Sequence, residues 1–185
     1  MIRIKKPQIE ILQKDSPLLR KVSCLVPESE IKSTDTKKLI SDLKKAMDSQ
    51  SDAIAISAIQ IGKPLRLFMI SKKIYEILEE NDEASRGKKD LVFINPKITK
   101  TSKDKQNLEE GCLSVRYFYG KVERPSKATI EWHDENGNKM SRGVSGLLAQ
   151  IVQHEHDHLN GVLFIDKATE LVEITPEEFE KNLKS

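Results

Sequence analysis

The chain has 185 residues, 37% hydrophobic and 32% charged, which is typical of a soluble globular protein, and we expect residues 1–185 to form one domain. Its 31 basic and 29 acidic residues nearly cancel to +2, which argues against partners such as nucleic acid or a membrane. Two cysteines, Cys24 and Cys112, and no apolar run for a signal peptide predict a cytoplasmic protein whose thiols are reduced.

The first half of the chain is predicted to contain one clear helix and three buried strands. Residues 1–32 form an irregular arm in which Pro17 begins a short helical turn. Ser33 precedes a helix that is identified by apolar residues at helical spacing, namely Leu39, Ile40, Leu43, Ala46 and Met47. Strands are predicted at 53–62, 65–71 and 91–95, the last of them stopped by Pro96, with 98–102 as a candidate continuation of the sheet. A short helix around Ile74 and a surface loop fill the segment 72–90.

The second half alternates short strands with one long helix. Residues 116–120 are predicted to be an aromatic loop that either borders a cleft or packs on the surface. Strands are expected at 122–124, 128–132, 139–144 and 162–165, with a hairpin turn at 134–138. Ser145 and Gly161 bound the long helix, and Thr175 caps a short closing helix that docks through its own residues Phe179 and Leu183. This pattern, without βαβ alternation, predicts an α+β fold with mixed or antiparallel sheets around a central helix.

The long helix carries the pattern H-E-x-x-H at His154, Glu155 and His158. Histidines four residues apart lie one turn apart on the same face, so both rings can reach one cation, while the glutamate can act on a water. The same arc of about 120° holds the apolar residues Leu147, Leu148 and Ile151. The trio therefore faces the interior, where a metal would compensate the cost of burying it. The alternative is a solvated helix, but a separate polar side is already formed by Gln150, Gln153, His156 and Asp157.

A third ligand has to come from elsewhere in the chain. Cys112 is a candidate because Gly111 beside it permits a close approach of the backbone, although a free cysteine is more often a small buried hydrophobe. Gln60 is the one long polar residue of the segment 53–62, and it either bonds to the backbone of a buried strand or serves the site.

Three blocks of the chain resemble the peptide deformylase family. Residues 110–114 read E-G-C-L-S, residues 153–159 match Q-H-E-x-D-H-L, and residues 53–62 align with G-x-G-x-A-A-x-Q-I-G. The likeness keeps the family's order and spans roughly residues 15–166. It implies that the metal ligands are Cys112, His154 and His158. It further implies that Glu155 is the general base and that Gln60 and the backbone N–H of Leu113 bind the formyl oxygen.

The resemblance implies a metal-dependent hydrolase that removes the N-formyl group from the N-terminal methionine of new polypeptides and releases formate. The expected cofactor is one divalent ion, Fe²⁺ in the cell, with Zn²⁺, Ni²⁺ or Co²⁺ in a purified sample. The expected partner is an N-formylmethionyl peptide, at the ribosome, and the expected state is a monomer in the cytoplasm or an organelle. The alternatives are a deformylase-like protein with weak or no turnover, and an amidohydrolase with another acyl preference.

The first block departs from the family pattern. Ala53 and Ala55 replace its two glycines, Ser57 replaces an alanine and Ile59 replaces the usual proline, while Arg116 later replaces a frequent proline. Alanine adopts a positive φ less readily than glycine, and an added methyl group can narrow a groove. These changes spare the ligands and bear on substrate fit and rate. The methionine side chain is expected to contact Ile151 and the aromatic loop.

Overall fold

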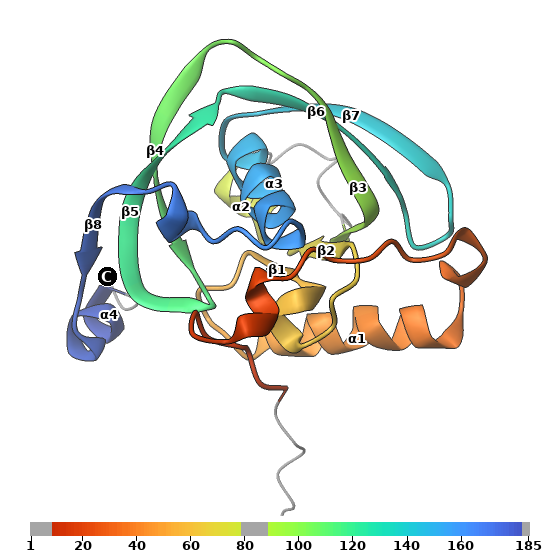
Figure 1. Cartoon of the computed structure of the whole chain (residues 1–185), viewed down its shortest axis with the longest axis horizontal. Coiled ribbons are helices and arrows are strands. Elements are labelled where there is room, and N and C mark those ends of the chain that lie inside the picture. Colours follow the sequence, from red (N-terminus) through yellow and green to blue (C-terminus); the bar gives the residue numbers. More distant parts are fainter. Residues whose placement is uncertain (1–8, 79–88, 183–185) are drawn as a thin grey trace, which may run out of the picture.

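The computed structural model describes residues 9–78 and 89–182, and within them two antiparallel sheets surround one helix (Figure 1). The larger sheet has the order β1-β2-β3-β6-β7 and the smaller has the order β4-β5-β8. The strands of the larger sheet are β1 (Ala55–Ser57), β2 (Leu67–Ile70), β3 (Leu91–Thr101), β6 (Lys127–His133) and β7 (Lys139–Ser145). Those of the smaller sheet are β4 (Lys105–Cys112), β5 (Val115–Pro125) and β8 (Thr169–Glu173). The expected α+β class is confirmed.

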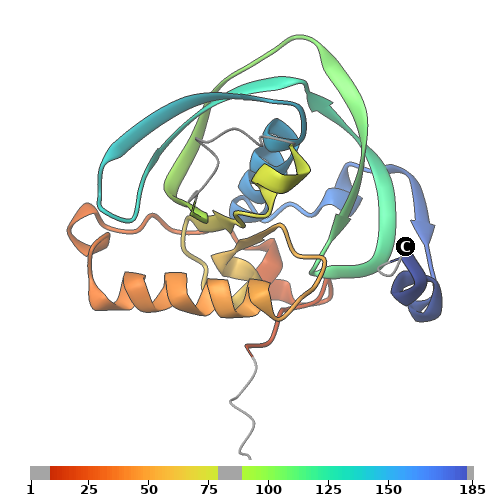
Figure 2. The same ribbon diagram turned by 180° about the vertical axis from the view of Figure 1, so that it is seen from behind.

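The central helix is α3 (Gly146–Leu159), which lies inside an arch made by the long strands of both sheets. It contacts β1, β3, β6 and β7 of the larger sheet and β5 of the smaller one. Figure 2 shows the same arch from behind, with α1 (Thr34–Asp48) running along the side opposite to the curved strands. The helix that carries H-E-x-x-H is therefore enclosed by strands.

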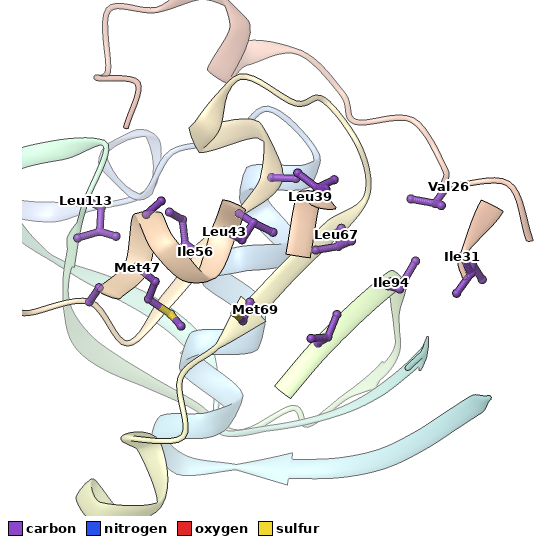
Figure 3. Close-up of a cluster of buried hydrophobic side chains, with 14 residues drawn as sticks. Val26, Ile31, Leu39, Leu43, Met47, Ile56, Leu67, Met69, Ile94 and Leu113 are labelled. Atoms are coloured by element: carbon purple, nitrogen blue, oxygen red, sulfur yellow. The ribbon is translucent and has the colours of Figure 1, made fainter. Parts of the chain in front are cut away.

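Helix α1 covers the first strands through one apolar face. Ser33, which precedes this helix as expected, caps it by accepting a hydrogen bond from the backbone N–H of Thr36 at 3.1 Å. Figure 3 shows the buried side chains between α1 and the strands, including Leu39, Leu43, Met47, Ile56, Leu67 and Met69. Leu113 lies at one end of this cluster and Ile31 at the other, so the segment after Cys112 is anchored to the main core.

The second cluster holds α3 against the larger sheet. Phe68 stacks on Phe93 with ring centroids 4.5 Å apart, and Trp132 packs on Phe93 at 4.8 Å. Helix α3 contributes its buried residues Leu148, Ala149, Val152 and Leu159. Because this face of α3 is fixed by apolar packing, the orientation of its histidines is fixed as well.

Gly161 ends the region of α3, as predicted, and the structure shows why glycine is needed there. Its φ is +73°, and a Cβ atom at this position would lie 2.5 Å from the carbonyl oxygen of Arg20. The N-terminal arm thus passes directly over the end of the helix, and only glycine leaves room for it.

Several local predictions are confirmed. The turn at 134–138 joins β6 and β7, with Asp134 Oδ1 accepting from the N–H groups of Asn136 and Asn138 at 2.8 Å each. Helix α4 (Pro176–Asn182) begins with reciprocal bonds between Thr175 and Glu178. Ser145 occupies the N-cap position of α3, but its side chain makes no capping hydrogen bond.

Two predicted strands are wrong in part or entirely. Residues 53–62 form only the short β1 and then a 3₁₀ turn at Ala58–Ile61, because the N–H of Ser57 bonds to Gln60 Oε1 at 2.8 Å and closes a helical turn. Residues 162–165 lead into another 3₁₀ turn at Phe164–Asp166, closed by the N–H of Leu163 bonding to Asp166 Oδ2. Short apolar runs do not separate strands from buried helical turns.

Three further differences concern strand limits. The aromatic residues 116–120 belong to β5 and do not form a loop, since β5 pairs on both sides with β4 and β8. Pro96 does not stop β3, which continues to Thr101 after a register shift between Ile94 and Lys97. Strand β8 was not predicted, because its residues are all exposed and lack an alternating pattern.

The segment 72–90 begins with the expected short helix, α2 (Ile74–Ile77). Most of the surface loop predicted after it lies outside the described residues, and so does Leu183 of the closing helix. None of the helices in the described ranges is long and apolar enough to cross a membrane.

Candidate metal centre

The three predicted ligands come together. Cys112 is the last residue of β4, and α3 carries His154 and His158 one turn apart. One ligand atom from each, a thiol sulfur and two ring nitrogens, lies within 4.8 Å of the other two, and Cys112 Sγ is 3.3 Å from His158 Nε2. Donors that share one ion at about 2.0–2.3 Å must converge in this way. His133, at the end of β6, is not part of this group.

The protonation of His158 suits a ligand. Burial lowers the pKa of His158 well below its usual value, which favours the neutral ring, whereas at His154 burial is outweighed by Cys112 and Glu110, which raise its pKa well above that value. Neutral imidazole is the form that binds metals. The buried Nδ1 of His158 has no hydrogen-bond partner among the described residues, and Nε2 is the nitrogen that faces the sulfur. The donor set of one thiolate and two imidazoles therefore fits a divalent transition metal.

A buried ion-pair network holds His154 from the other side. Glu110 Oε2 lies 2.9 Å from His154 Nδ1, which leaves the other ring nitrogen for a metal. Arg124 donates to both carboxylate oxygens of Glu110 at 2.8 and 2.9 Å, and to Asp157 at 2.5 Å. The side chains of Arg124 and Glu110 are only 4% and 3% exposed. Lys167 completes the network at 2.7 Å from Asp157.

The charge of Glu110 is secured by these partners. Burial opposes its ionisation, but hydrogen bonds from Arg124 and His154 outweigh burial and lower the pKa of the carboxyl to about 2. A carboxylate on Nδ1 fixes the tautomer and the orientation of a ligating histidine. The network therefore orients one candidate ligand in advance.

Glu155 lies next to the ligands but bonds to a different segment. Its Oε2 accepts a hydrogen bond from Ser57 Oγ at 2.5 Å, and its side chain lines the same cavity as Cys112 and His154. Burial raises the pKa of Glu155, while His154 and Ser57 act in the opposite direction. A carboxylate with a raised pKa in a cavity has the properties of a general base.

Gln60 and Leu113 both lie beside Cys112 in the cavity. Gln60 Nε2 donates to Ser114 Oγ at 3.0 Å and lies 3.6 Å from Cys112 Sγ. Leu113 follows Cys112 directly and lines the cavity, and its carbonyl accepts from Gln13 at 3.1 Å. All six residues singled out from the sequence are thus gathered around one point.

The cavity has a volume of about 340 Å³. Its lining includes the polar groups described above and a set of apolar and aromatic residues, namely Leu147, Ile151, Tyr117, Phe118, Tyr119 and Phe179. The ring of Tyr119 packs against Gly111, where a Cβ atom would lie 2.8 Å from it. The glycine before Cys112 therefore serves close packing, as its position suggests.

Sequence reasoning missed most of the supporting residues. Glu110, Arg124 and Ser57 were given no role, and Gln153 and Asp157 were placed on a solvated side of the helix. In the structure Gln153 is buried and donates to the carbonyl of Pro125 at 3.0 Å, and Asp157 binds Arg124. The available signal was the alternation along this strand, which places Arg124 on the same buried face as Val122, where a charged side chain requires a partner.

The substituted residues of the first block have ordinary backbone geometry. Among the described residues, the non-glycine positions with positive φ are Asn95, Tyr117 and Glu170, so Ala53 and Ala55 are not strained. Both residues line the cavity, and Ala53 is also buried in the core. The expected conflict between alanine and a positive φ is therefore wrong, and only the volume of the methyl groups remains.

Comparison with known proteins agrees with this geometry. The family model for polypeptide deformylase matches residues 8–173. The chain belongs to the peptide deformylase family. The peptide deformylase of Rhizobium meliloti is 41% identical over 155 residues, which cover 84% of this chain and 82% of that protein. That of Psychrobacter cryohalolentis is 42% identical over 164 residues, covering 88% and 80%.

Solved deformylase structures share the fold. A peptide deformylase from Synechococcus elongatus in complex with actinonin has a TM-score of 0.74 and 32% identity, covering 99% of this chain and 88% of that one. A peptide deformylase from Plasmodium falciparum has a TM-score of 0.74 and 33% identity, covering 95% and 93%.

Proposed function

We propose that this chain removes the N-formyl group from the N-terminal methionine of new polypeptides and releases formate. Membership of the peptide deformylase family makes it a hydrolase that acts on N-formylmethionyl peptides. The observation that carries the proposal is that Cys112, His154 and Glu155 line one cavity, with His158 completing the group of donors.

The proposed cofactor is one divalent ion held by Cys112, His154 and His158. Fe²⁺ is proposed for the cell and Zn²⁺, Ni²⁺ or Co²⁺ as substitutes, since one thiolate and two imidazoles suit each of them. Three protein ligands leave a position open, as in catalytic centres. Such an ion supplies Lewis-acid chemistry, in that it lowers the pKa of a water and polarises a carbonyl oxygen.

Glu155 is proposed to move the proton. It takes a proton from the water that adds to the formyl carbon, and it delivers this proton to the leaving amine as the carbon–nitrogen bond breaks. The products are formate and the free amino terminus. Positioned acid–base groups contribute about 10²–10⁴ to the rate. Support comes from its burial, its raised pKa and its place in the cavity.

Gln60 and the backbone N–H of Leu113 are proposed to donate to the formyl oxygen as negative charge develops on it. Donors that are fixed beforehand stabilise such charge without reorganisation. The amide of Gln60 is held in this sense, because its oxygen accepts from the N–H of Ser57 and its nitrogen points toward Cys112.

The apolar residues of the cavity lining are proposed to take the methionine side chain. Leu147 and Ile151 from α3 and Tyr119 from β5 supply this surface, as part of it was expected to come from Ile151 and the aromatic segment. The formyl group is the smallest acyl group, so a narrow space beside the ligands would admit it and exclude acetyl.

The cellular setting is proposed from the state of the cysteines and from the contacts of α3. We propose a single-domain monomer that works in the cytoplasm, or an organelle, on peptides leaving the ribosome. Both cysteines are free, which suits a reducing compartment. Helix α3 contacts strands of both sheets, which suits one domain with a shared core.

The direct test is release of formate from formyl-Met-Ala-Ser by iron-loaded protein under anaerobic conditions. We expect turnover by the native sequence and a loss of about 10²–10⁴-fold in Glu155→Ala. Acetyl-Met-Ala-Ser serves as the substrate control and should not be cleaved. If the native protein released no more formate than the variant, the proposed function would be wrong.

A further inference from the structure

Ser57 joins two of the proposed reacting groups. It is fully buried at the end of β1, and its Oγ donates to Glu155 Oε2 at 2.5 Å. The same Oγ lies 3.3 Å from the backbone oxygen of Glu155. The aligned family block has alanine at this place, so the hydroxyl group is a departure of this chain from that pattern.

The backbone of Ser57 holds the second group. Its N–H donates to Gln60 Oε1 at 2.8 Å. With Oε1 occupied, Gln60 directs its Nε2 toward Ser114 Oγ and Cys112 Sγ, at 3.0 and 3.6 Å. The side chain of Ser57 therefore acts on Glu155, and its main chain acts on Gln60.

We propose that Ser57 is a positioning residue whose hydroxyl group fixes the carboxylate of Glu155 for proton transfer. This inference rests on the proposed function of Glu155. The last torsion of a glutamate side chain is soft, so an unrestrained carboxylate samples many orientations. A short bond from a hydroxyl to a charged oxygen is among the stronger hydrogen bonds, and it fixes the carboxylate plane. Oε1 is then the oxygen that receives the proton.

The same hydrogen bond could instead stabilise the fold, because it links β1 to α3 across 98 positions of the chain. A purely structural link and a positioning link make different predictions. A positioning link affects the rate only while Glu155 is present to be positioned. A structural link affects stability and rate whether or not the carboxylate is there.

The first experiment compares Ser57→Ala with the native protein by kcat and KM for formyl-Met-Ala-Ser. This variant keeps the backbone N–H that holds Gln60 and removes only the hydroxyl group. We expect kcat to fall about tenfold, as for a modest misplacement of a reacting group, with KM unchanged within about twofold. Ser57→Cys keeps a weaker donor of similar size and should give an intermediate kcat.

Ser23→Ala is the matched control. Ser23 is also buried and bonds by its backbone N–H to Leu159 at the end of α3, at 2.9 Å, but its hydroxyl group has no partner among the described residues. We expect its kcat and KM to stay at native values. If Ser57→Ala behaved like Ser23→Ala, the inference would be overturned.

The second experiment repeats Ser57→Ala in a Glu155→Ala background, where residual turnover is followed at high enzyme concentration. We expect no further loss beyond about twofold, since the group being positioned is gone. A second tenfold loss would overturn the inference and assign Ser57 a structural role.

A double-mutant cycle measured by urea unfolding separates this inference from the proposed function. It compares the native protein, Ser57→Ala, Glu155→Ala and the double variant. Ser57→Ala should shift the unfolding midpoint more in the native background than in Glu155→Ala. If the native protein had no activity but this coupling were present, the proposed function would be wrong, while the hydrogen bond between Ser57 and Glu155 would be supported. If the coupling were absent, the inference would fail whatever the activity.

Discussion

Replacing Arg124 by leucine should damage both the fold and the metal centre, because this arginine is the hub of the buried network. It makes two hydrogen bonds to Glu110 and one to Asp157, and its side chain is 4% exposed. Leucine would leave the buried carboxylate of Glu110 without its cation, and would leave the half-buried Asp157 with Lys167 alone. Breaking a buried pair by removing one partner costs about 3–5 kcal/mol. Glu110 would also lose its hold on His154, and loss of such an outer contact lowers metal affinity about 10–100-fold.

The assay is urea unfolding of the metal-free protein together with metal titration against a competing chelator. Arg124→Lys keeps the charge but cannot repeat the two-pronged contact with Glu110, so it should fall between leucine and the native residue. Lys105→Ala is the matched control, since this exposed residue of the same sheet bonds to Glu123 at 2.7 Å and should cost less than about 1 kcal/mol. The reasoning would be refuted if Arg124→Leu changed stability and metal affinity no more than Lys105→Ala.

Three further variants test separate parts of the structure. Gly161→Ala should lower the free energy of unfolding by more than about 1 kcal/mol in urea, because its φ is +73° and its Cβ would meet Arg20, whereas Gly143→Ala, where nothing lies nearby, should cost far less. The double variant of Ala53→Gly and Ala55→Gly should change kcat less than about threefold, because neither residue has a positive φ; a large gain would show that the methyl groups obstruct the groove. Phe179→Ala should raise KM about fivefold, or about 1 kcal/mol, with kcat nearly constant, because the ring lines the cavity. Leu171→Ala, which removes an exposed side chain of β8, is the control for Phe179→Ala. An equal KM in these two variants would contradict the role of Phe179 in substrate binding.

Most of the metal centre could be predicted from local patterns in the sequence. His154 and His158 are one helical turn apart, so their convergence follows from helix geometry once the helix is recognised. Cys112 could be added only through its setting after Gly111 and through the family resemblance. The helix, its end at Gly161 and the hairpin turn at 134–138 could be predicted for the same reason, because each is formed by residues that are close together in the sequence.

The supporting contacts could not be predicted because they join distant segments. Ser57 meets Glu155 across 98 positions, and Arg124 meets Asp157 across 33. Nothing in the local pattern of either partner indicates the other. The strand predictions for 53–62 and 162–165 were wrong for a different reason, since the apolar residues of these segments fit a buried turn as well as a strand. Tertiary packing and the bonds of Gln60 and Asp166 decided between these states.

The central claim is that Cys112, His154 and His158 hold the same ion. X-ray absorption of the metal-loaded protein tests it most directly, because the spectrum counts sulfur and nitrogen neighbours of the ion. The account predicts one sulfur at about 2.3 Å and two imidazole nitrogens at about 2.0–2.1 Å, with the sulfur lost in Cys112→Ser. A shell without sulfur in the native protein, or a sulfur that persists in Cys112→Ser, would contradict it.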